Sequence, residues 1–137
     1  MIAIAISEFN AEVAQGLLDG CRTALLESGF DNDDIIVVRV PGAFELPATA
    51  KRLSGHPGVR AVITLGAVIR GETDHYHFIS TAVASGIMQV TLESTVPVFF
   101  GVLTCQDSDL ARARSEPGKG RNKGYEIGVA AARLISS

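Results

Sequence analysis

The residues best suited to chemistry are concentrated in one short segment, RGETDHYHF, at positions 70–78. It holds two of the three histidines of the chain, His75 and His77, together with two acidic residues. Two histidines so close together suggest a metal site. On a helix, however, metal ligands share a face only at a spacing of three or four residues. These two are two apart, or about 200° around a helix axis, so we expect no metal here.

Gly71 and the residues after it suggest a different chemistry, the binding of an anion. The segment follows an apolar run and opens a helix, whose first N–H groups and dipole favour a phosphate. Gly71 lets a ligand approach the backbone, and Thr73 can cap the helix or donate to a phosphate oxygen. Glu72 and Asp74 are expected to point outward. His75 would lie beside the anion, where an imidazole can transfer protons near neutral pH.

Four apolar runs predict the strands that must position these residues. They lie at 2–7, 35–40, 61–69 and 96–104 and are nearly continuous, as in strands covered on both faces. Helices are predicted between and after them, the first capped by Asn10 and ended by Gly29, the others at about 44–53, 74–93, 108–114 and 122–134. This alternation predicts a single α/β domain over residues 1–137. We expect an open parallel four-stranded sheet in flavodoxin-like order 2-1-3-4, flanked by helices on both faces.

Composition and charge exclude several classes of protein. The chain has 137 residues, 47% of them hydrophobic and 20% charged, which is ordinary for a globular domain. A net charge of −3 indicates no nucleic-acid partner. The opening MIAIAI is too short for a signal peptide or a membrane span, so no membrane is expected. Cys21 and Cys105 lie in apolar segments and predict reduced core thiols in a cytoplasmic protein.

The helix predicted at 74–93 has no acidic residue, lysine or arginine between positions 77 and 92. Its apolar stripe consists of Ile79, Val83, Ile87 and Val90, and its other positions are mostly small residues. A helix that is apolar all round is usually buried on more than one side. Because a small domain has too few neighbours for that, the helix predicts self-association.

Ligands of such a sheet bind outside the carboxyl ends of its strands. Those ends carry SEFN (7–10), PGAFELP (41–47), IRGETDH (69–75) and TCQD (104–107). Phe9 suits stacking on a planar ligand, although a core role explains it equally well. Glu45 could bind a ligand or be a solvated first-turn acid. The basic residues at 112–123 either form a solvated surface or reach over a phosphate.

Together these motifs resemble the lumazine synthase (6,7-dimethyl-8-ribityllumazine synthase) family. The resemblance rests on FN (9–10), VPGAFELP (40–47), GAVIRGETDHY (66–76), VPVFFGVLT (96–104) and NKG (122–124), which follow family order over essentially the whole chain. It implies a transferase that condenses 5-amino-6-(D-ribitylamino)uracil with 3,4-dihydroxy-2-butanone 4-phosphate, the penultimate step of riboflavin biosynthesis. It implies no metal or organic cofactor, so the enzyme would mainly position two small molecules and move protons.

The resemblance also implies the roles of individual residues. His75 would transfer protons. The pyrimidine and its ribityl chain would be held by Phe9, Ala43, Phe44, Glu45, Ile69, Lys123 and, from a neighbouring subunit, Phe100. The phosphate would be held by Gly71, Glu72, Thr73 and Arg114. The subunits would form a ring of five, with the helix at 74–93 packed around its axis.

Some features depart from the family pattern. Glu8 and His77 differ in kind from the usual residues. The chain lacks an extra first strand, and its loop around Pro117 is longer than in members that form sixty-subunit shells, so we expect a pentamer instead. The longer loop also makes Arg112 an alternative to Arg114. Two other functions stay open, an archaeal-type riboflavin synthase and a non-catalytic flavin- or lumazine-binding assembly protein.

Overall fold

Four parallel strands form the centre of the molecule. The structure, a computed structural model, describes residues 1–71, 75–118 and 120–136. Within these residues the strands are β1 (Ile2–Ser7), β2 (Ile35–Val40), β3 (Ala61–Ile69) and β4 (Val98–Cys105). They pair in parallel in the order β2-β1-β3-β4. The predicted α/β fold and its strand order are therefore confirmed.

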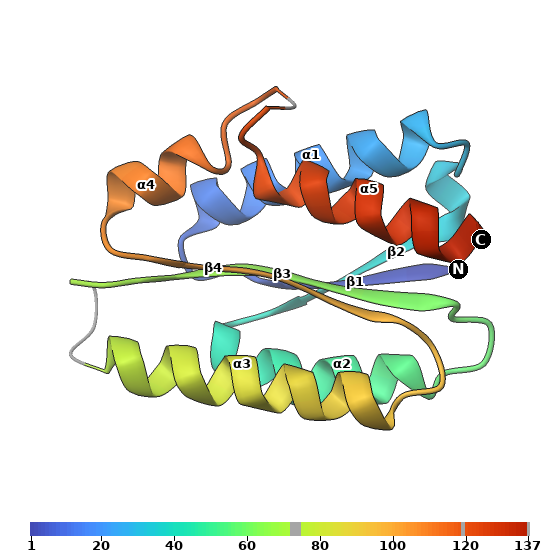
Figure 1. The fold of residues 1–137 in the computed structure, drawn as a ribbon, viewed down its shortest axis with the longest axis horizontal. Helices are drawn as coiled ribbons and strands as arrows, with labels where there is room; N and C mark the ends of the chain where they lie inside the picture. Colours follow the sequence, from blue (N-terminus) through green and yellow to red (C-terminus); the bar gives the residue numbers. More distant parts are fainter. Residues whose placement is uncertain (72–74, 119, 137) are drawn as a thin grey trace.

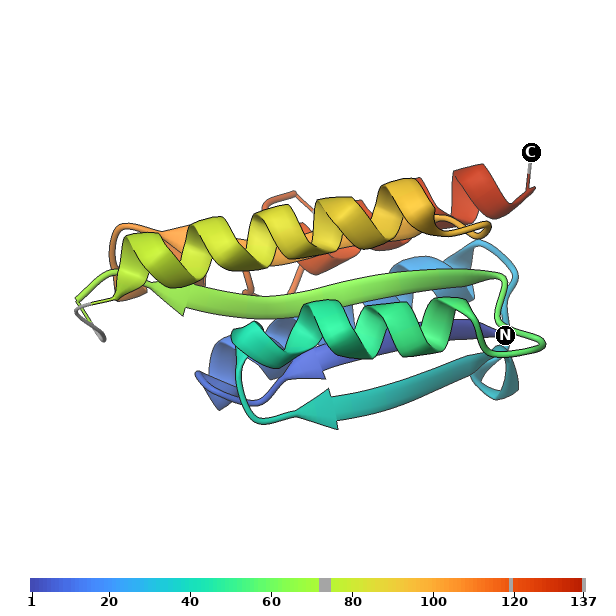
Figure 2. The same cartoon turned by 90° about the horizontal axis from the view of Figure 1, so that it is seen from below.

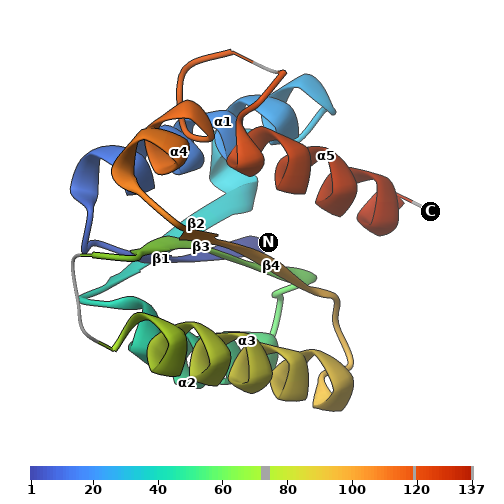
Figure 3. The same ribbon diagram turned by 60° about the vertical axis from the view of Figure 1, so that its left-hand side comes forward.

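Helices cover both faces of this sheet (Figures 1 and 3). They are α1 (Ala11–Glu27), α2 (Leu46–Ser54), α3 (Tyr76–Glu93), α4 (Ser108–Ala113) and α5 (Lys123–Ser136), with short 3-10 turns η1 (Asn32–Asp34) and η2 (Ala43–Glu45). One face carries α1, α4 and α5, while α2 and α3 lie side by side on the other (Figure 2). Among the described helices, none is long and apolar enough to cross a membrane. Because every strand runs the same way, all four carboxyl ends meet at one edge, on the left in Figure 1.

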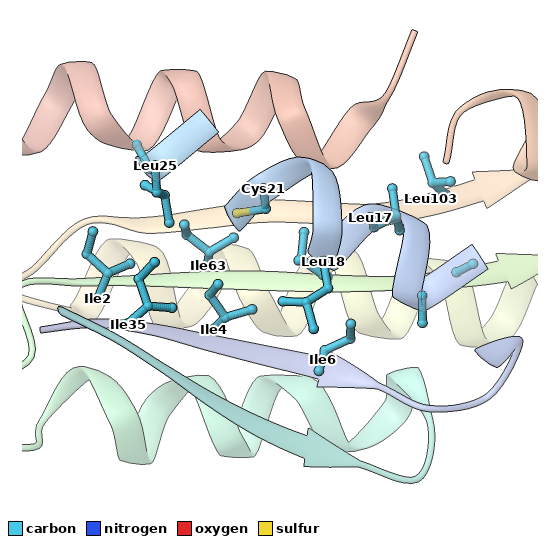
Figure 4. Close-up of a cluster of buried hydrophobic side chains, with 14 of the residues drawn as sticks. Ile2, Ile4, Ile6, Leu17, Leu18, Cys21, Leu25, Ile35, Ile63 and Leu103 are labelled. Atoms are coloured by element: carbon cyan, nitrogen blue, oxygen red, sulfur yellow. The ribbon is translucent and has the colours of Figure 1, made fainter. Parts of the chain in front are cut away.

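Alternating side chains of the strands build a core on each face of the sheet. On one face, Ile2, Ile4 and Ile6 of β1 pack with Leu17, Leu18, Cys21 and Leu25 of α1 (Figure 4). On the other, Ala3 and Ala5 of β1 share a cluster with Leu46 of α2 and Val83 and Ile87 of α3. Burial of each of these leucine or isoleucine side chains contributes about 1.5–3 kcal/mol to the free energy of folding. The central strands β1 and β3 are buried throughout, as predicted, whereas the edge strands β2 and β4 are partly exposed.

Glycines bring α1 and α5 into close contact. Gly124 and Gly128 of α5 are four residues apart, so they share a face, and that face packs directly against α1. A Cβ atom on Gly124 would collide with the carbonyl oxygen of Leu17. The absence of these side chains therefore determines how closely the helices pack, and with that where α5 begins.

Asn122 fixes the start of α5 by hydrogen bonds. Its side chain is buried, and Nδ2 donates to the carbonyl oxygens of Gly16 at 3.1 Å and Glu116 at 2.9 Å. Its Oδ1 accepts from the backbone N–H of Tyr125 at 2.9 Å, as the side chain of an N-cap residue does. The helix predicted from about residue 122 therefore begins one residue later, because Asn122 is its cap and Lys123 its first residue.

Other helix boundaries also differ from the predictions. The helix predicted from about residue 44 begins at Leu46, because residues 43–45 form the turn η2, and Pro47 lies in the first turn of α2. The helix predicted from residue 74 begins at Tyr76, and Asp74 lies outside the described residues. The predicted end of α1 is confirmed, since Gly29 follows the helix with a φ of 101°, which favours glycine.

Candidate functional site

A pocket of about 270 Å³ opens at the carboxyl ends of β1 and β3. We call it the Phe9 pocket, and it is lined by Phe9, Asn10, Gly42, Ala43, Phe44, Glu45, Ala67, Val68, Ile69 and Ile79. Ser7 at the end of β1 pairs with Val40 at the end of β2, so the segments that follow both strands leave the sheet together. The mostly apolar lining with a few polar groups is typical of small-molecule sites.

Two aromatic rings of this pocket lie largely in solvent. The exposed fraction of Phe9 is 58% and that of Phe44 is 57%. The core explanation for Phe9 is therefore wrong, because a core ring would be buried. Exposed rings at the mouth of an apolar pocket are suited to contact with a flat, partly polar ligand.

The turn before α2 orients the carboxylate of Glu45. Its Oε1 accepts a hydrogen bond from the backbone N–H of Gly42 at 2.9 Å. The backbone of Glu45 is also held, since its N–H donates to the carbonyl oxygen of Gly42 at 3.2 Å and its carbonyl oxygen accepts from Thr49 Oγ1 at 3.0 Å. Three local hydrogen bonds thus fix an acceptor at the wall of the pocket, where it can meet hydroxyl donors.

Asn10 follows Phe9 and corrects one prediction. It stands at the N-cap position of α1, but its side chain makes no capping hydrogen bond. Its Nδ2 donates instead to the carbonyl oxygen of Ala67 in β3 at 3.4 Å. The reason is its left-handed backbone, with φ 65° and ψ 57°, since capping side chains normally sit on an extended residue.

The connection from β3 to α3 is only partly described. Gly71 has a φ of 95°, which favours glycine, and no atom lies within 4 Å of the place a Cβ would take. Glu72 and Thr73, predicted to bind phosphate, lie outside the described residues. His75 precedes α3 as an exposed residue, and its carbonyl oxygen accepts from the N–H of Ile79 at 2.8 Å. Neither Gly71 nor His75 is among the residues that line the Phe9 pocket.

His77 lies on α3 as an exposed side chain, with its ring edge against Tyr76 at 5.0 Å between centroids. Among the residues that the structure describes, no group of three or more His, Cys, Asp or Glu side chains could hold a metal ion.

A second pocket of about 350 Å³ lies beside β4, between the sheet and the helices α4 and α5. We call it the Arg114 pocket, and it is lined by Phe100, Val102, Leu103, Thr104, Cys105, Gln106, Leu110, Arg114 and Lys123. Phe100 is 38% exposed on the edge strand. The backbone N–H of Lys123 donates to the carbonyl oxygen of Arg114 at 2.8 Å, so the two cationic residues are held next to each other.

Cys105 gives this pocket a buried, neutral wall. Burial raises the pKa of the Cys105 thiol, and the positive charge of Arg114 only partly offsets this. The thiol is free. Cys105 and its neighbour Gln106 were not predicted as site residues, although the sequence pointed to them as the end of a strand.

The two pockets divide the predicted site residues into separate groups. Phe9, Ala43, Phe44, Glu45 and Ile69 line the Phe9 pocket. Phe100, Arg114 and Lys123 line the Arg114 pocket, which shares no lining residue with the first. A single chain therefore does not bring all the predicted binding residues into one cavity. Arg112, the alternative to Arg114, lines neither pocket and pairs with Asp109 at 3.3 Å.

Known proteins resemble this chain over its whole length. The sequence model of the 6,7-dimethyl-8-ribityllumazine synthase family matches residues 1–137. A protein of that name from Thermus thermophilus is 44% identical over 134 residues, which are 98% of this chain and 85% of the relative. Relatives of the same name from Desulfotalea psychrophila and Coxiella burnetii are each 46% identical over 134 residues, covering 98% of this chain and 86% and 88% of theirs. The chain therefore belongs to the 6,7-dimethyl-8-ribityllumazine synthase family.

Proposed function

We propose that this chain, as a single domain, condenses 5-amino-6-(D-ribitylamino)uracil with 3,4-dihydroxy-2-butanone 4-phosphate to form 6,7-dimethyl-8-ribityllumazine. The observation that carries the proposal is the match to synthases of this name along the whole chain. The exposed rings of the Phe9 pocket support it, because they suit a flat heterocycle with a polar chain. The relatives' names favour neither a riboflavin synthase nor a non-catalytic binding protein.

The Phe9 pocket would hold the pyrimidine. Phe9 would stack on the ring, as aromatic side chains do on bases. The backbone at Ala43 and Phe44 and the nearby Ile69 would bind the edge of the ring, while the Glu45 carboxylate would accept from ribityl hydroxyls. This division fits the geometry, since Glu45 is already oriented by its bond from Gly42.

The phosphate ester would bind at the β3–α3 turn. Gly71, Glu72 and Thr73, which precede α3 in the sequence, would supply donors, and the dipole of that helix favours an anion. Arg114 would add a bidentate contact to the same phosphate. The N-terminal end of α3 and the guanidinium of Arg114 would thus stabilise the negative charge of the leaving phosphate.

The proposed reaction consists of additions and eliminations, and each of them moves protons. The pyrimidine amine attacks the ketone carbonyl, and loss of water gives an imine. Phosphate then leaves, and the ring closes with loss of a second water. His75, at the start of α3, would accept and return protons in these steps. Holding both substrates together would supply much of the acceleration.

A second copy of the chain would complete the site. The proposed contributions of Phe100, Arg114 and Lys123 come from the Arg114 pocket, which is separate from the Phe9 pocket in one subunit. We propose that the Arg114 pocket of one subunit faces the Phe9 pocket of its neighbour. Each site in the ring would then take residues from two adjacent chains.

The surface of α3 supports self-association into a homopentamer. Its exposed positions are 77, 78, 81, 84, 85, 88, 89, 92 and 93, which recur at helical spacing. Leu92 is 78% exposed, Phe78 69% and Met88 57%. Three large apolar side chains exposed along one helix suit contact with another chain. We propose that five copies pack this helix around a common axis, and that the loop around Pro117 favours this pentamer over a sixty-subunit shell.

We place the protein in the cytoplasm. Cys21 and Cys105 are both buried and free, as is usual in a reducing compartment.

The assay mixes the protein with both substrates and follows the absorbance of the lumazine. We expect formation well above the uncatalysed background. Three outcomes separate the alternatives. Consumption of lumazine supplied alone would indicate a riboflavin synthase, and substrate binding without turnover would indicate a non-catalytic protein. No acceleration at saturating substrate would refute the proposal.

The role of His75 is tested by replacing it with alanine. We expect turnover to fall by about 100-fold, the lower end of the range for acid–base catalysis, because proximity would supply much of the rate. His77→Ala is the matched control, since His77 is exposed on the same helix, and should leave turnover unchanged. If His75→Ala instead weakens pyrimidine binding and leaves turnover intact, the proposed role is wrong.

A further inference from the structure

We propose that Asn10 is a positioning residue, which holds Phe9 where its ring can stack on the pyrimidine substrate. This inference rests on the proposed function, because it assigns Asn10 a task in the same pocket. Asn10 lines the Phe9 pocket and connects Phe9 to the first turn of α1.

The backbone of Asn10 is the first observation. Among the described residues it is the only non-glycine with a positive φ. This left-handed conformation is unfavourable for residues with a Cβ atom, and asparagine tolerates it best. Such conformations persist only where the surroundings hold them, and they are concentrated at functional sites. Here it turns the chain sharply between the exposed Phe9 and the start of α1.

The side chain of Asn10 is the second observation. An asparagine before a helix usually caps that helix, but this side chain makes no capping bond. Its Nδ2 donates to the carbonyl oxygen of Ala67 at 3.4 Å, a contact across 57 positions of sequence. Ala67 belongs to β3 and also lines the pocket. Asn10 therefore links the segment after β1 to the part of the pocket wall that β3 provides.

The position of Phe9 depends on such links because packing restrains it little. Its side chain is 58% exposed. On one side, its backbone N–H donates to the carbonyl oxygen of Pro41 at 3.1 Å, next to a bond from Glu8 to Val40 at 2.8 Å. On the other side, Asn10 follows Phe9 in the chain and is hydrogen-bonded to Ala67 of β3. Phe9 is thus tied to the β2 end by its own backbone and to the β3 end by Asn10.

Two substitutions separate the contributions of Asn10. Asn10→Gly keeps the left-handed backbone accessible and removes the amide, whereas Asn10→Ala removes the amide and disfavours the backbone conformation. The probe is an analogue of the pyrimidine substrate that carries a nitro group in place of the attacking amine, titrated by calorimetry. We expect Asn10→Gly to bind it about 3- to 10-fold more weakly, the loss of one hydrogen bond, and Asn10→Ala more weakly still. The KM for the butanone phosphate should stay within about twofold, because Asn10 is assigned only to the pyrimidine.

A double-mutant cycle tests whether Asn10 acts through Phe9. In a Phe9→Ala background, Asn10→Gly should cause no further loss of analogue affinity. An additional loss equal to that in the native background would overturn the proposal, since Asn10 would then act independently of the ring. Asn32→Gly, the same change at an exposed position in η1, is the control and should leave affinity unchanged.

The remaining outcomes also decide the question. If the Asn10→Gly protein binds the analogue as tightly as the native protein, the positioning role fails while the proposed function stands. If affinity and thermal midpoint fall together, and both substrates bind more weakly, the residue is merely structural. If the native protein itself does not bind the analogue, the proposed function fails and this inference with it. Should Asn10→Ala not fold, Asn10→Gly alone gives the answer.

Discussion

Gly124 lies where α5 crosses α1 without room for a side chain, and replacing it by alanine would strain the contact between them. The added Cβ would meet the carbonyl oxygen of Leu17, a backbone atom that cannot rotate away. Overpacking costs about 1–3 kcal/mol, and alanine recovers about 1 kcal/mol of helix propensity. Because the clash is with a backbone atom, we take the upper end of the overpacking cost, about 3 kcal/mol, and subtract about 1 kcal/mol of helix propensity. We therefore expect the free energy of unfolding to fall by about 2 kcal/mol.

This loss corresponds to a measurable change in thermal midpoint. Unfolding entropy is about 2.1 cal/mol/K per residue, which for 137 residues amounts to about 0.3 kcal/mol/K. The midpoint should therefore fall by about 7 °C, measured by circular dichroism at one fixed protein concentration because an oligomer's midpoint depends on it. Gly120→Ala is the matched control, since no atom lies within 4 Å of its added Cβ, and it should not lower the midpoint.

The same substitution should also disturb the Arg114 pocket, because Lys123 is the residue before Gly124. The backbone N–H of Lys123 donates a hydrogen bond to the carbonyl oxygen of Arg114 at 2.8 Å, so displacement of α5 moves both pocket residues. We expect the KM for the butanone phosphate to rise. An unchanged midpoint in Gly124→Ala, or an equal fall in Gly120→Ala, would show that the contact yields and would refute the reasoning.

Three further predictions follow from charge and burial. Arg114→Lys keeps the charge but loses the bidentate geometry, so KM for the butanone phosphate should rise with little change for the pyrimidine, as steady-state kinetics would show. Leu92→Glu places a charge on α3 at a leucine that is 78% exposed, and native mass spectrometry should show smaller assemblies, whereas an unchanged assembly would exclude α3 from the interface. Burial raises the pKa of Cys21 to about 12, partly offset by Arg22, while an unfolded thiol ionises near about 8.5. As the pH rises, the thiol therefore loses its proton first in the unfolded state. The free energy of unfolding should be unaffected by this thiol below the unfolded pKa and should decline as the pH rises from there toward 12. Urea titrations should show a smaller decline in Cys21→Ala, and an equal decline would contradict the assignment.

Much of the fold follows from local patterns in the sequence. The runs at 2–7 and 61–69 are apolar at almost every position, which indicates central strands, and they are buried throughout. Short connections and right-handed crossovers then leave few strand orders. The end of α1 at Gly29 follows from the conformational freedom of that one residue. These features depend on residues close together in the chain.

The candidate site was predictable in its composition but not in its arrangement. Phe9, Phe44 and Glu45 stand at strand ends, which a parallel sheet brings to one edge, and they line one pocket. The sequence did not reveal that Arg114 and Lys123 line a different pocket, together with Phe100, because that depends on how α4 and α5 pack beside the edge strand β4. Cys105 was missed as a pocket residue for the same reason.

The sequence by itself determined the elements, the strand order and the family. Only the tertiary structure showed that the side chain of Asn10 donates a hydrogen bond to Ala67 instead of capping its helix, and that the side chain of Asn122 donates one to the carbonyl oxygen of Gly16. It also showed that the binding residues of one chain form two cavities. The physical reason is that helix and strand preferences act over a few residues, whereas hydrogen bonds and pocket walls join residues that only folding brings together.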